Sequence, residues 1–311
     1  MRPLALLALL LAACTAEAPA DTAPPARPAA DAPVIAVPEA FGDYWYQGQA
    51  ELTSYALEQA RYGEVHPGEA VLIFVTEPFS RTRQVKLDQA GSAGDDEVTV
   101  LKLNATRTFV TGIYPYSMMT SVFTPVGEGP APLKVTTSSQ EWCGHTFTQL
   151  NRTADGWRAR LFSYFESESD QDLALPDVMA EDGLWTLIRL DPEALPTGDV
   201  QLLPGGIYQR LSHRDLRPYA AVAALSAPGD DGLRTYTVTY PDLDRTLRIR
   251  FQAAFPHAIE GWEEERPDGF GENARRLTTR AARKERIMLD YWAHNGRDDV
   301  VLRARLGLEA D

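Results

Sequence analysis

Cysteine and basic residues are scarce in this sequence. Its 311 residues include two cysteines, too few for a disulfide framework or a cysteine-rich zinc site. Lysine and arginine together number 30 against 44 aspartates and glutamates, which gives a net charge of −14. A nucleic-acid-binding protein neutralises phosphates with clustered basic side chains, so this balance argues against nucleic acid as a partner.

Sequence motifs of familiar enzyme classes are missing as well. The chain contains no Gly-x-Ser-x-Gly, no P-loop and no Gly-x-Gly-x-x-Gly. Its five histidines do not have the spacing of a zinc site, and we expect no cofactor. His213 and Asp215 supply two groups of a possible site. An enzyme whose residues gather from distant strands would carry none of these motifs.

The first 13 residues have the pattern of a bacterial lipoprotein signal peptide. One positive charge at Arg2 precedes the apolar run Leu4–Ala13, which as a helix would span about half of a bilayer core. The run ends in Leu11-Ala12-Ala13-Cys14, which resembles a lipobox and implies cleavage before Cys14 and its lipidation, palmitate included. An ordinary secretory signal is the alternative. Thr15 resembles the residue that follows the cysteine in outer-membrane cargo, so we expect a lipid anchor in the outer membrane and a periplasm-facing protein.

Residues 14–38 are expected to form a tether. Nine of the 24 residues from Thr15 to Pro38 are alanine and six are proline. Proline at this density favours extended, partly polyproline II chain. We expect a single β-rich domain over residues 39–311, with a possible seam between two halves near 170–182.

Strand patterns fill the domain. Ala70–Thr76 is a buried-strand run, and other segments alternate or nearly alternate between polar and apolar residues. These are Val98–Leu103, Thr120–Thr124, Trp157–Glu166, Tyr236–Tyr240 and Thr246–Phe255. β-branched and aromatic residues suit a pleated, half-buried surface.

Turns and helices complete the expected architecture. Ala154-Asp155-Gly156 predicts a hairpin between Phe147–Leu150 and Trp157–Phe165. Tyr55–Arg61 is either a strand or a short helix, and Asp298–Leu306 has the acidic first turn of a terminal helix. The sequence therefore predicts a mainly β fold, a large antiparallel curved sheet or incomplete barrel with few short helices.

Four motifs carry a resemblance that covers nearly the whole domain. They are Asp43-Tyr-Trp-Tyr-Gln-Gly48, Glu58-Gln-Ala-Arg-Tyr-Gly-Glu64, Gly112-Ile-Tyr-Pro-Tyr-Ser-Met-Met119 and Ser138-Ser-Gln-Glu-Trp-Cys-Gly-His145. They resemble a family of uncharacterised bacterial envelope lipoproteins often labelled "septum formation inhibitor Maf". The Ser-Pro-Arg-Arg-type element of true Maf pyrophosphatases is missing here. The resemblance implies an envelope location and the overall fold, and leaves the function open.

Cys143 and His145 form a candidate catalytic pair. On one strand, residues i and i+2 share a face, so the thiol and the imidazole could approach each other. A thiolate paired with an imidazolium is the nucleophile of cysteine hydrolases. The plainer interpretation is a small buried thiol beside Trp142, with Gly144 at a bulge.

Four alternating carboxylates form a candidate calcium site. On one extended segment all of them would share a face, where like charges repel unless a cation or solvent screens them. Ca²⁺ prefers several carboxylate oxygens, although the EF-hand pattern is absent and a solvated loop is the alternative. The four residues are Glu166, Glu168, Asp170 and Asp172.

Two aromatic clusters near strand ends are candidate ligand-binding residues. Rings at a pocket mouth can stack on sugars or hold acyl chains, although such clusters also fill cores. Pro115 is expected to interrupt sheet pairing, so that the kinked segment Ile113–Met119 borders a cavity. The candidates are Tyr44, Trp45, Tyr114, Tyr116, Met118 and Met119.

These patterns favour a binding or structural role in the cell envelope, with a lipid or a glycan as the ligand, over catalysis. The alternative is an envelope hydrolase that uses Cys143 and His145, or carboxylates gathered from separate strands. The sequence leaves the oligomeric state open.

Overall fold

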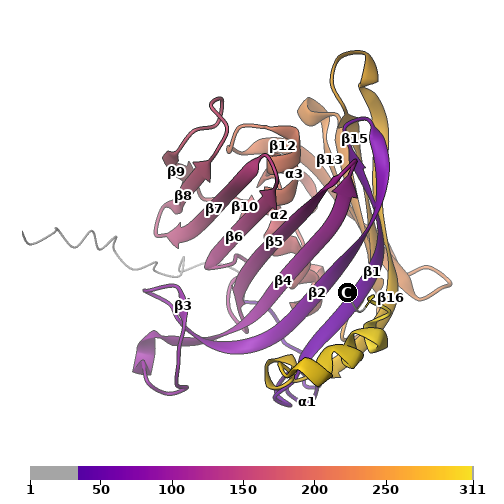
Figure 1. The fold of residues 1–311 in the computed structure, drawn as a ribbon. Helices are drawn as coiled ribbons and strands as arrows, with labels where there is room; N and C mark the ends of the chain where they lie inside the picture. The colour runs from indigo at the N-terminus through magenta and orange to yellow at the C-terminus, as the bar shows by residue number, and fades with distance from the viewer. Residues whose placement is uncertain (1–33, 310–311) are drawn as a thin grey trace, which may run out of the picture.

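Strands dominate this computed structural model, which describes residues 34–309 (Figure 1). The first half of the described chain contributes β1 (Ala50–Arg61), β2 (Glu64–Ser80), β3 (Val85–Lys86), β4 (Glu97–Thr111), β5 (Tyr114–Pro125), β6 (Lys134–Glu141), β7 (Gly144–Thr153), β8 (Gly156–Ser163) and β9 (Gln171–Pro176). The second half contributes β10 (Met179–Ala180), β11 (Gly198–Leu203), β12 (Tyr219–Leu225), β13 (Leu233–Tyr240), β14 (Arg245–Gln252), β15 (Ile259–Asp268) and β16 (Arg275–Leu289).

Helices are short. The α-helices of the described residues are α1 (Phe41–Trp45), α2 (Glu181–Leu190) and α3 (Gly206–Ser212). The 3-10 helices are η1 (Gly94–Asp96), η2 (Pro192–Ala194), η3 (Pro241–Leu243), η4 (Gly271–Asn273), η5 (Tyr291–Ala293) and η6 (Arg297–Leu306). No helix within residues 34–309 has the length and apolar character needed to cross a membrane.

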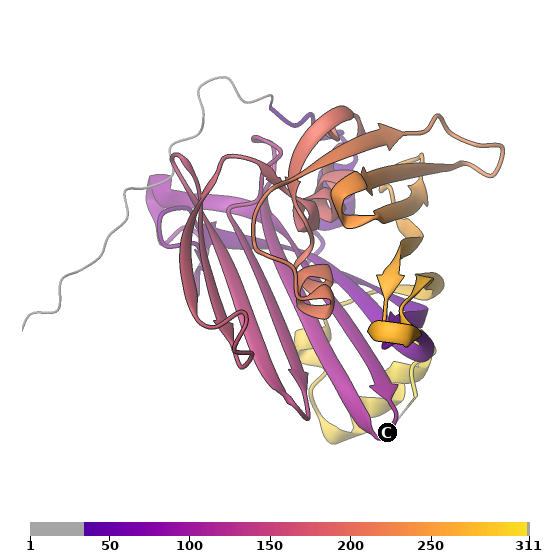
Figure 2. The ribbon, with the colours of Figure 1, turned by 90° about the horizontal axis from the view of Figure 1, so that it is seen from above.

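The strands form one curved, unclosed sheet, which confirms the predicted fold class. Its order is β10-β11-β12-β13-β14-β15-β16-β1-β2-β4-β5-β6-β7-β8-β9, with β3 paired to β2. Every pair is antiparallel except β10 with β11. Within this sheet β9 and β10 are the two edges, and both lie in the segment 170–182 that was expected to contain a seam. The sheet curls around α2 and α3, which lie on its concave side (Figure 2).

The hairpin between β7 and β8 shows how local sequence sets the register. Thr153 pairs with Gly156 across a two-residue turn, Ala154-Asp155, as predicted. Gly156 has a φ of +139°, and a Cβ there would lie 2.2 Å from the Leu175 carbonyl oxygen. Glycine is therefore required at this position for β9 to pack beside the turn.

Helix α2 is buried on all its sides. Leu184, Leu187 and Ile188 are fully buried, and Thr186 exchanges a hydrogen bond with Thr124 of β5 (Oγ1–Oγ1, 2.7 Å). The Arg189 guanidinium pairs with both carboxylate oxygens of Glu51 on β1, each at 2.7 Å. The sequence of α2 is amphipathic, but its polar side is buried as well as its apolar side. The helix has only ten residues, so its periodic signal in the sequence is short.

The structure decides three expectations about elements. Tyr55–Arg61 is a strand, the first of its two alternatives, within β1, and the expected terminal helix is present as the 3-10 helix η6. The third expectation is wrong. Ile113–Met119 is not kinked, because Pro115 pairs with Val110 of β4 inside a regular ladder. β6 pairs with β5 only from Ser117 onward, so Pro115 has a neighbouring strand on one side only. A strand tolerates a residue without an N–H at such a position.

The chain packs onto the domain slightly before residue 39. Ile35 is 2% exposed, and its N–H donates to the Glu128 carbonyl oxygen at 2.8 Å. Residues 35–38 therefore belong to the packed domain. Residues 1–33, which contain the expected signal peptide, Cys14 and most of the tether, lie outside the described residues.

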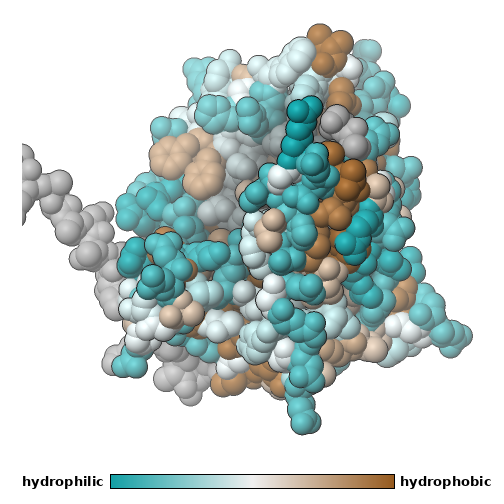
Figure 3. Space-filling view, turned by 60° about the horizontal axis from the view of Figure 1, so that its bottom comes forward, coloured by the Kyte–Doolittle hydropathy of each residue, from teal (hydrophilic) through white to brown (hydrophobic). Residues whose placement is uncertain are grey.

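The two ends of the curled sheet differ. The turns that follow β1, β4, β6, β8 and β15 lie together at one end, at the top of Figure 1. At the other end are α1 and η6. Figure 3, in which this second end comes forward, shows hydrophilic and hydrophobic side chains mixed over its surface.

Candidate functional site

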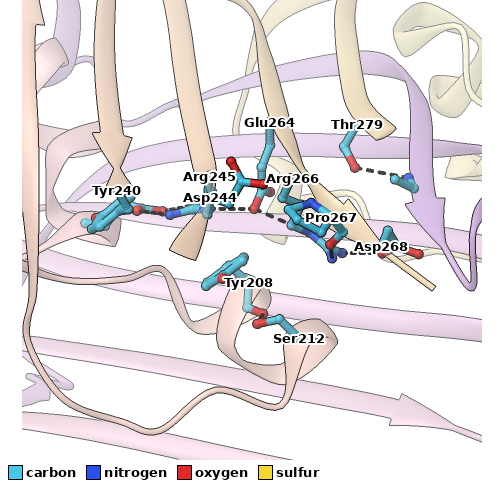
Figure 4. A network of polar contacts seen from close by, with 12 residues as sticks. Tyr208, Ser212, Tyr240, Asp244, Arg245, Glu264, Arg266, Pro267, Asp268 and Thr279 are labelled. Atoms are coloured by element: carbon cyan, nitrogen blue, oxygen red, sulfur yellow. Dashed lines mark hydrogen bonds and ion pairs between the residues drawn. The ribbon is translucent and has the colours of Figure 1, made fainter. Parts of the chain in front are cut away.

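Buried charges gather on the inner wall of the sheet (Figure 4). Arg245 of β14 contacts two carboxylates, with its Nη2 2.7 Å from Glu181 Oε1 and its Nε 2.7 Å from Glu264 Oε1. Tyr240 Oη donates to Glu181 Oε2 at 2.7 Å. Burial opposes ionisation of Glu264, but the nearby Arg245 and Arg266 guanidinium groups hold the pKa of Glu264 below its usual range.

The charged chain continues along β15. Arg266 Nη2 lies 2.8 Å from Asp268 Oδ2, and Asp268 Oδ1 accepts a hydrogen bond from the Gly63 N–H at 2.9 Å. The ring of Tyr208 on α3 lies under this network, with its centroid 4.2 Å from Arg245 Cζ (Figure 4). The network thus connects α2, α3 and the turn after β1.

A small cavity, which we call the inner chamber, lies beside this network. It has about 40 Å³ of space for the centres of water molecules, enough for a few waters and too little for an organic ligand. Arg107 of β4, which is buried, and Asp182 of α2, which is half-buried, border it. Its lining residues are Leu72, Leu103, Ala105, Thr106, Arg107, Thr120, Val122, Glu181, Asp182, Trp185, Gly205, Ile207, Tyr208, Arg245, Leu247, Trp262 and Glu264.

Asp182 has the most unusual chemistry in the inner chamber. Burial raises the pKa of Asp182 to about 7, and the neighbouring Glu181 charge adds to the effect. The Gly206 N–H, at the start of α3, donates to Asp182 Oδ2 at 2.9 Å and favours the ionised form. Asp182 therefore links the charge of the chamber to the position of α3.

On the other side of α3 lies a larger and more polar cavity, which we call the edge cleft. Its volume is about 180 Å³, measured in the same way. It lies between the β7–β9 edge of the sheet and α3 with its following loop. Its lining residues are Thr146, Thr148, Leu161, Ser167, Glu168, Gln171, Gly206, Gln209, Arg210, His213, Arg214, Asp215 and Leu216.

Glu168 and His213 are in direct polar contact in the edge cleft. Glu168 Oε1 lies 2.6 Å from His213 Nδ1, and Ser163 Oγ donates to Glu168 Oε2 at 2.6 Å. Burial raises the pKa of Glu168, but the hydrogen bonds from His213 and Ser163 outweigh it, so that the net shift is downward. The contact fixes the turn after β8 to the end of α3.

Gln209 and Arg210 bring unused hydrogen-bond donors to the edge cleft. Gln209 is 8% exposed and Arg210 6% exposed. Arg210 Nη2 lies 3.1 Å from Glu141 Oε1, and its Cζ lies 4.4 Å from the centroid of the Phe165 ring. Within residues 34–309, Gln209 Nε2 and Arg210 Nε have no hydrogen-bond partner. A buried donor without a partner is costly, and both residues line the edge cleft.

The Cys143 and His145 pair is not built as expected. Cys143 lies in the turn between β6 and β7, beside Trp142, and it is exposed rather than buried. Only His145 lies on a strand, so the two side chains do not share a strand face. The reason is the register, because Glu141 pairs with Gly144 and leaves the two residues between them to make the turn.

The four alternating carboxylates are also arranged differently. Glu166, Glu168 and Asp170 lie in the irregular turn before β9, and only Asp172 lies on a strand. Asp172 makes a two-pronged contact with Arg158 of β8, at 2.8 and 3.0 Å. Within residues 34–309, no cluster of three or more candidate ligands fits a metal ion.

The six aromatic and methionine candidates are divided between core and surface. Tyr116 and Met118 pack with Phe109, Ile207 and Leu211 in a hydrophobic cluster. Tyr44 and Trp45 lie on α1, Tyr114 begins β5, and Met119 points outward. Neither the inner chamber nor the edge cleft is lined by any of the six.

Sequence reasoning singled out Glu168, His213 and Asp215, and the structure brings all three to the edge cleft. It missed Gln209 and Arg210, because a helix of seven residues gives little periodic signal. The inner-chamber charges did leave a signal. On β14, Arg245 shares a face with the buried Leu247 and Ile249, which places a charge on the inner side.

No protein-family model matches the sequence, and no curated protein matches it. Two solved structures are similar in part. A β-barrel-like protein of the domain of unknown function DUF1849 from Brucella abortus is 11% identical, with a TM-score of 0.43 over 78% of this chain and 98% of that chain. A porin-like protein from Bacteroides uniformis is 7% identical, with a TM-score of 0.20 over 76% and 95%. At these values neither match assigns a function to this chain.

Proposed function

We propose that the protein is a lipid-anchored component of the bacterial outer membrane, periplasm-facing, whose β-rich domain binds a neutral polar ligand in the edge cleft. The observation that carries the binding role is the pair of buried donors, Gln209 Nε2 and Arg210 Nε, at a cavity of about 180 Å³. The proposed location in the outer membrane rests on the sequence pattern around Cys14.

The lining of the edge cleft favours a glycan over a lipid. Two carboxylates, Glu168 and Asp215, accompany two arginines, Arg210 and Arg214, so neither sign of charge dominates. Amide and hydroxyl groups provide further hydrogen-bonding positions, and apolar side chains contribute little. An acyl chain needs an apolar wall, whereas sugar hydroxyls need donors and acceptors at close quarters.

Nothing in the described residues favours the cysteine hydrolase. The hydrogen bond with the Glu141 carboxylate raises the pKa of the Cys143 thiol, and burial and the Glu141 charge act in the same direction. A nucleophilic cysteine needs the opposite, a pKa held below its ordinary value. A binding role is therefore the better account of the fold.

Calorimetric titration with neutral disaccharides tests the proposal. The probes are N,N′-diacetylchitobiose, cellobiose and maltose. We expect at least one to bind, and Gln209→Leu to weaken it by about tenfold because a buried donor to the ligand is lost. The matched control is Gln201→Leu, on an exposed position of β11. Binding of none of the three, or equal binding by Gln209→Leu, would remove the proposed function.

A further inference from the structure

Six aromatic side chains form an arc over the end of the sheet where the edge cleft opens. We call this arc the aromatic rim. Its members lie on or beside the turns that follow β1, β4, β6, β8 and β15. They are Phe270, Tyr62, Tyr114, Trp142, Tyr164 and Phe165.

Contacts join neighbouring members of the aromatic rim in the part that lies away from the edge cleft. The Phe270 and Tyr62 ring centroids are 6.3 Å apart, and Tyr114 Oη donates to Tyr62 Oη at 3.1 Å. Tyr114 and Trp142 stack with centroids 6.3 Å apart and ring planes 28° from parallel. Four separate turns of the chain therefore hold one row of rings.

The aromatic rim ends in the edge cleft. The Tyr164 ring lies against the backbone of Gly144, where a Cβ would be 2.7 Å from the ring. The Phe165 centroid is 5.4 Å from that of Tyr164 and 5.1 Å from that of His213, which lines the cleft. Tyr164 and Phe165 thus connect the edge cleft to Gly144, two residues from Trp142.

Much of this aromatic surface faces solvent. Trp142 and Tyr164 are each 67% exposed, and Phe270 is 65% exposed. Large exposed rings grouped at one end of a molecule mark a contact surface. Glycine at position 144 leaves the room that the Tyr164 ring occupies, because a Cβ there would collide with the ring.

The charges around the aromatic rim indicate what it contacts. On or beside the same turns lie the exposed carboxylates Glu64, Glu166, Asp170 and Glu272, against two exposed arginines, Arg275 and Arg276. Negative charge at this density repels an anionic lipid surface or an anionic polymer. A pyranose ring has an apolar C–H face and hydroxyl edges, so a neutral sugar chain matches both the rings and the polar cleft.

We infer that the aromatic rim extends the edge cleft into a site for a neutral linear glycan. One end of the glycan lies in the edge cleft, hydrogen-bonded to Gln209 and Arg210, and successive sugar rings stack on Tyr164 and Trp142. This inference rests on the proposed function. It adds that the ligand is a chain of several sugars, and it names the residues that contact the further sugars.

The experiment compares chain lengths. Chitohexaose, cellohexaose and maltohexaose are titrated beside the corresponding disaccharides. The wild-type protein is expected to bind one hexasaccharide about tenfold more tightly than its disaccharide, because further rings find stacking partners. Trp142→Ala should remove this gain and leave disaccharide binding unchanged. The matched control, Trp292→Ala, changes an equally large exposed ring in η5 and should alter neither.

The outcomes distinguish binding at the aromatic rim from binding in the edge cleft. Equal affinity for short and long chains, or an unchanged gain in Trp142→Ala, overturns the inference and leaves the proposed function in place. Hexasaccharide binding that depends on Trp142 but not on Gln209 keeps the rim as a glycan site and removes the edge cleft. If phosphatidylcholine vesicles bind wild type but not Trp142→Ala, the rim is a membrane contact and the glycan inference is wrong.

Discussion

At the scale of single residues, Asp182 makes stability depend on pH. Burial raises the pKa of its carboxyl from 3.8 to about 7, so the folded protein favours the protonated form. The stability that Asp182 contributes is complete below about pH 4 and is lost as the pH rises toward and through 7, by at most roughly 4 kcal/mol. Asp182→Asn should therefore gain stability over wild type between about pH 5 and pH 8.

Urea unfolding followed by the fluorescence of Trp185 and Trp262 measures this difference. Asp199→Asn, at an exposed position of β11, is the matched control, and its unfolding free energy should equal that of wild type throughout this pH range. A constant difference between Asp182→Asn and wild type across this range would show that Asp182 titrates at its ordinary pKa in the folded protein.

Cys143 gives a second prediction at this scale. Its thiol is exposed, so a maleimide should label it in the folded protein, contrary to the sequence-based expectation of a buried thiol. The Glu141 carboxylate raises the pKa of the thiol, so labelling should be slow and should accelerate in Glu141→Gln. Mass spectrometry of the Cys143 peptide over time measures the rate, with Glu166→Gln as control. Labelling as fast in wild type as in Glu141→Gln would contradict the role of Glu141.

At the scale of elements, α2 depends on one buried ion pair. Arg189→Met leaves Glu51 ionised and unpaired at 1% exposure, which should cost roughly 3–5 kcal/mol of unfolding free energy. Adding Glu51→Leu should restore part of this loss, because the orphaned charge is removed. Arg248→Met, which breaks an exposed pair with Glu265, should cost less than about 1 kcal/mol.

Chemical denaturation of the two single variants and the double variant measures the coupling between Arg189 and Glu51. A double variant as unstable as the sum of the single changes would show that the pair does not act as a unit.

The strands were predictable because their information is local. Ala70–Thr76 lies in β2, Val98–Leu103 in β4 and Tyr236–Tyr240 in β13, each from its pattern of polar and apolar residues. The Ala154-Asp155-Gly156 turn fixed its hairpin without any distant contact. Cys143 could not be placed in the same way, because a shift of the turn by one residue decides whether it lies on a strand.

The candidate site was predictable only in part. Glu168 and His213 could be singled out separately, but their contact joins residues far apart in sequence. The edge cleft exists because β9 and α3 face each other across the open side of the sheet, and no local pattern records this. The buried charges of β14 and β15 are the opposite case, since Arg245 shares a strand face with Leu247 and Ile249, and Glu264 shares one with Trp262.

At the scale of the whole molecule, the proposed lipid anchor at Cys14 is open to a direct test. Cys14→Ser removes the thiol that lipidation would use, so the variant should leave the membrane fraction or keep its signal peptide. Metabolic labelling with a tagged fatty acid, followed by fractionation, measures both effects. Cys143→Ser is the matched control and should remain labelled and membrane-bound. Equal labelling of Cys14→Ser and wild type would be incompatible with an anchor at this residue.

The pairing of β1 with β16 has a consequence for the order of folding. Ala50 pairs with Leu289, so the centre of the sheet joins the first and the last strands of residues 34–309. Pairing between residues so distant in sequence forms slowly, because a long loop must close first. β1–β9 and β11–β16 can each begin to pair as separate antiparallel meanders before the rest of the chain is available. The two meanders join only when β16 arrives, so the sheet is completed in its middle, by the last strand to appear.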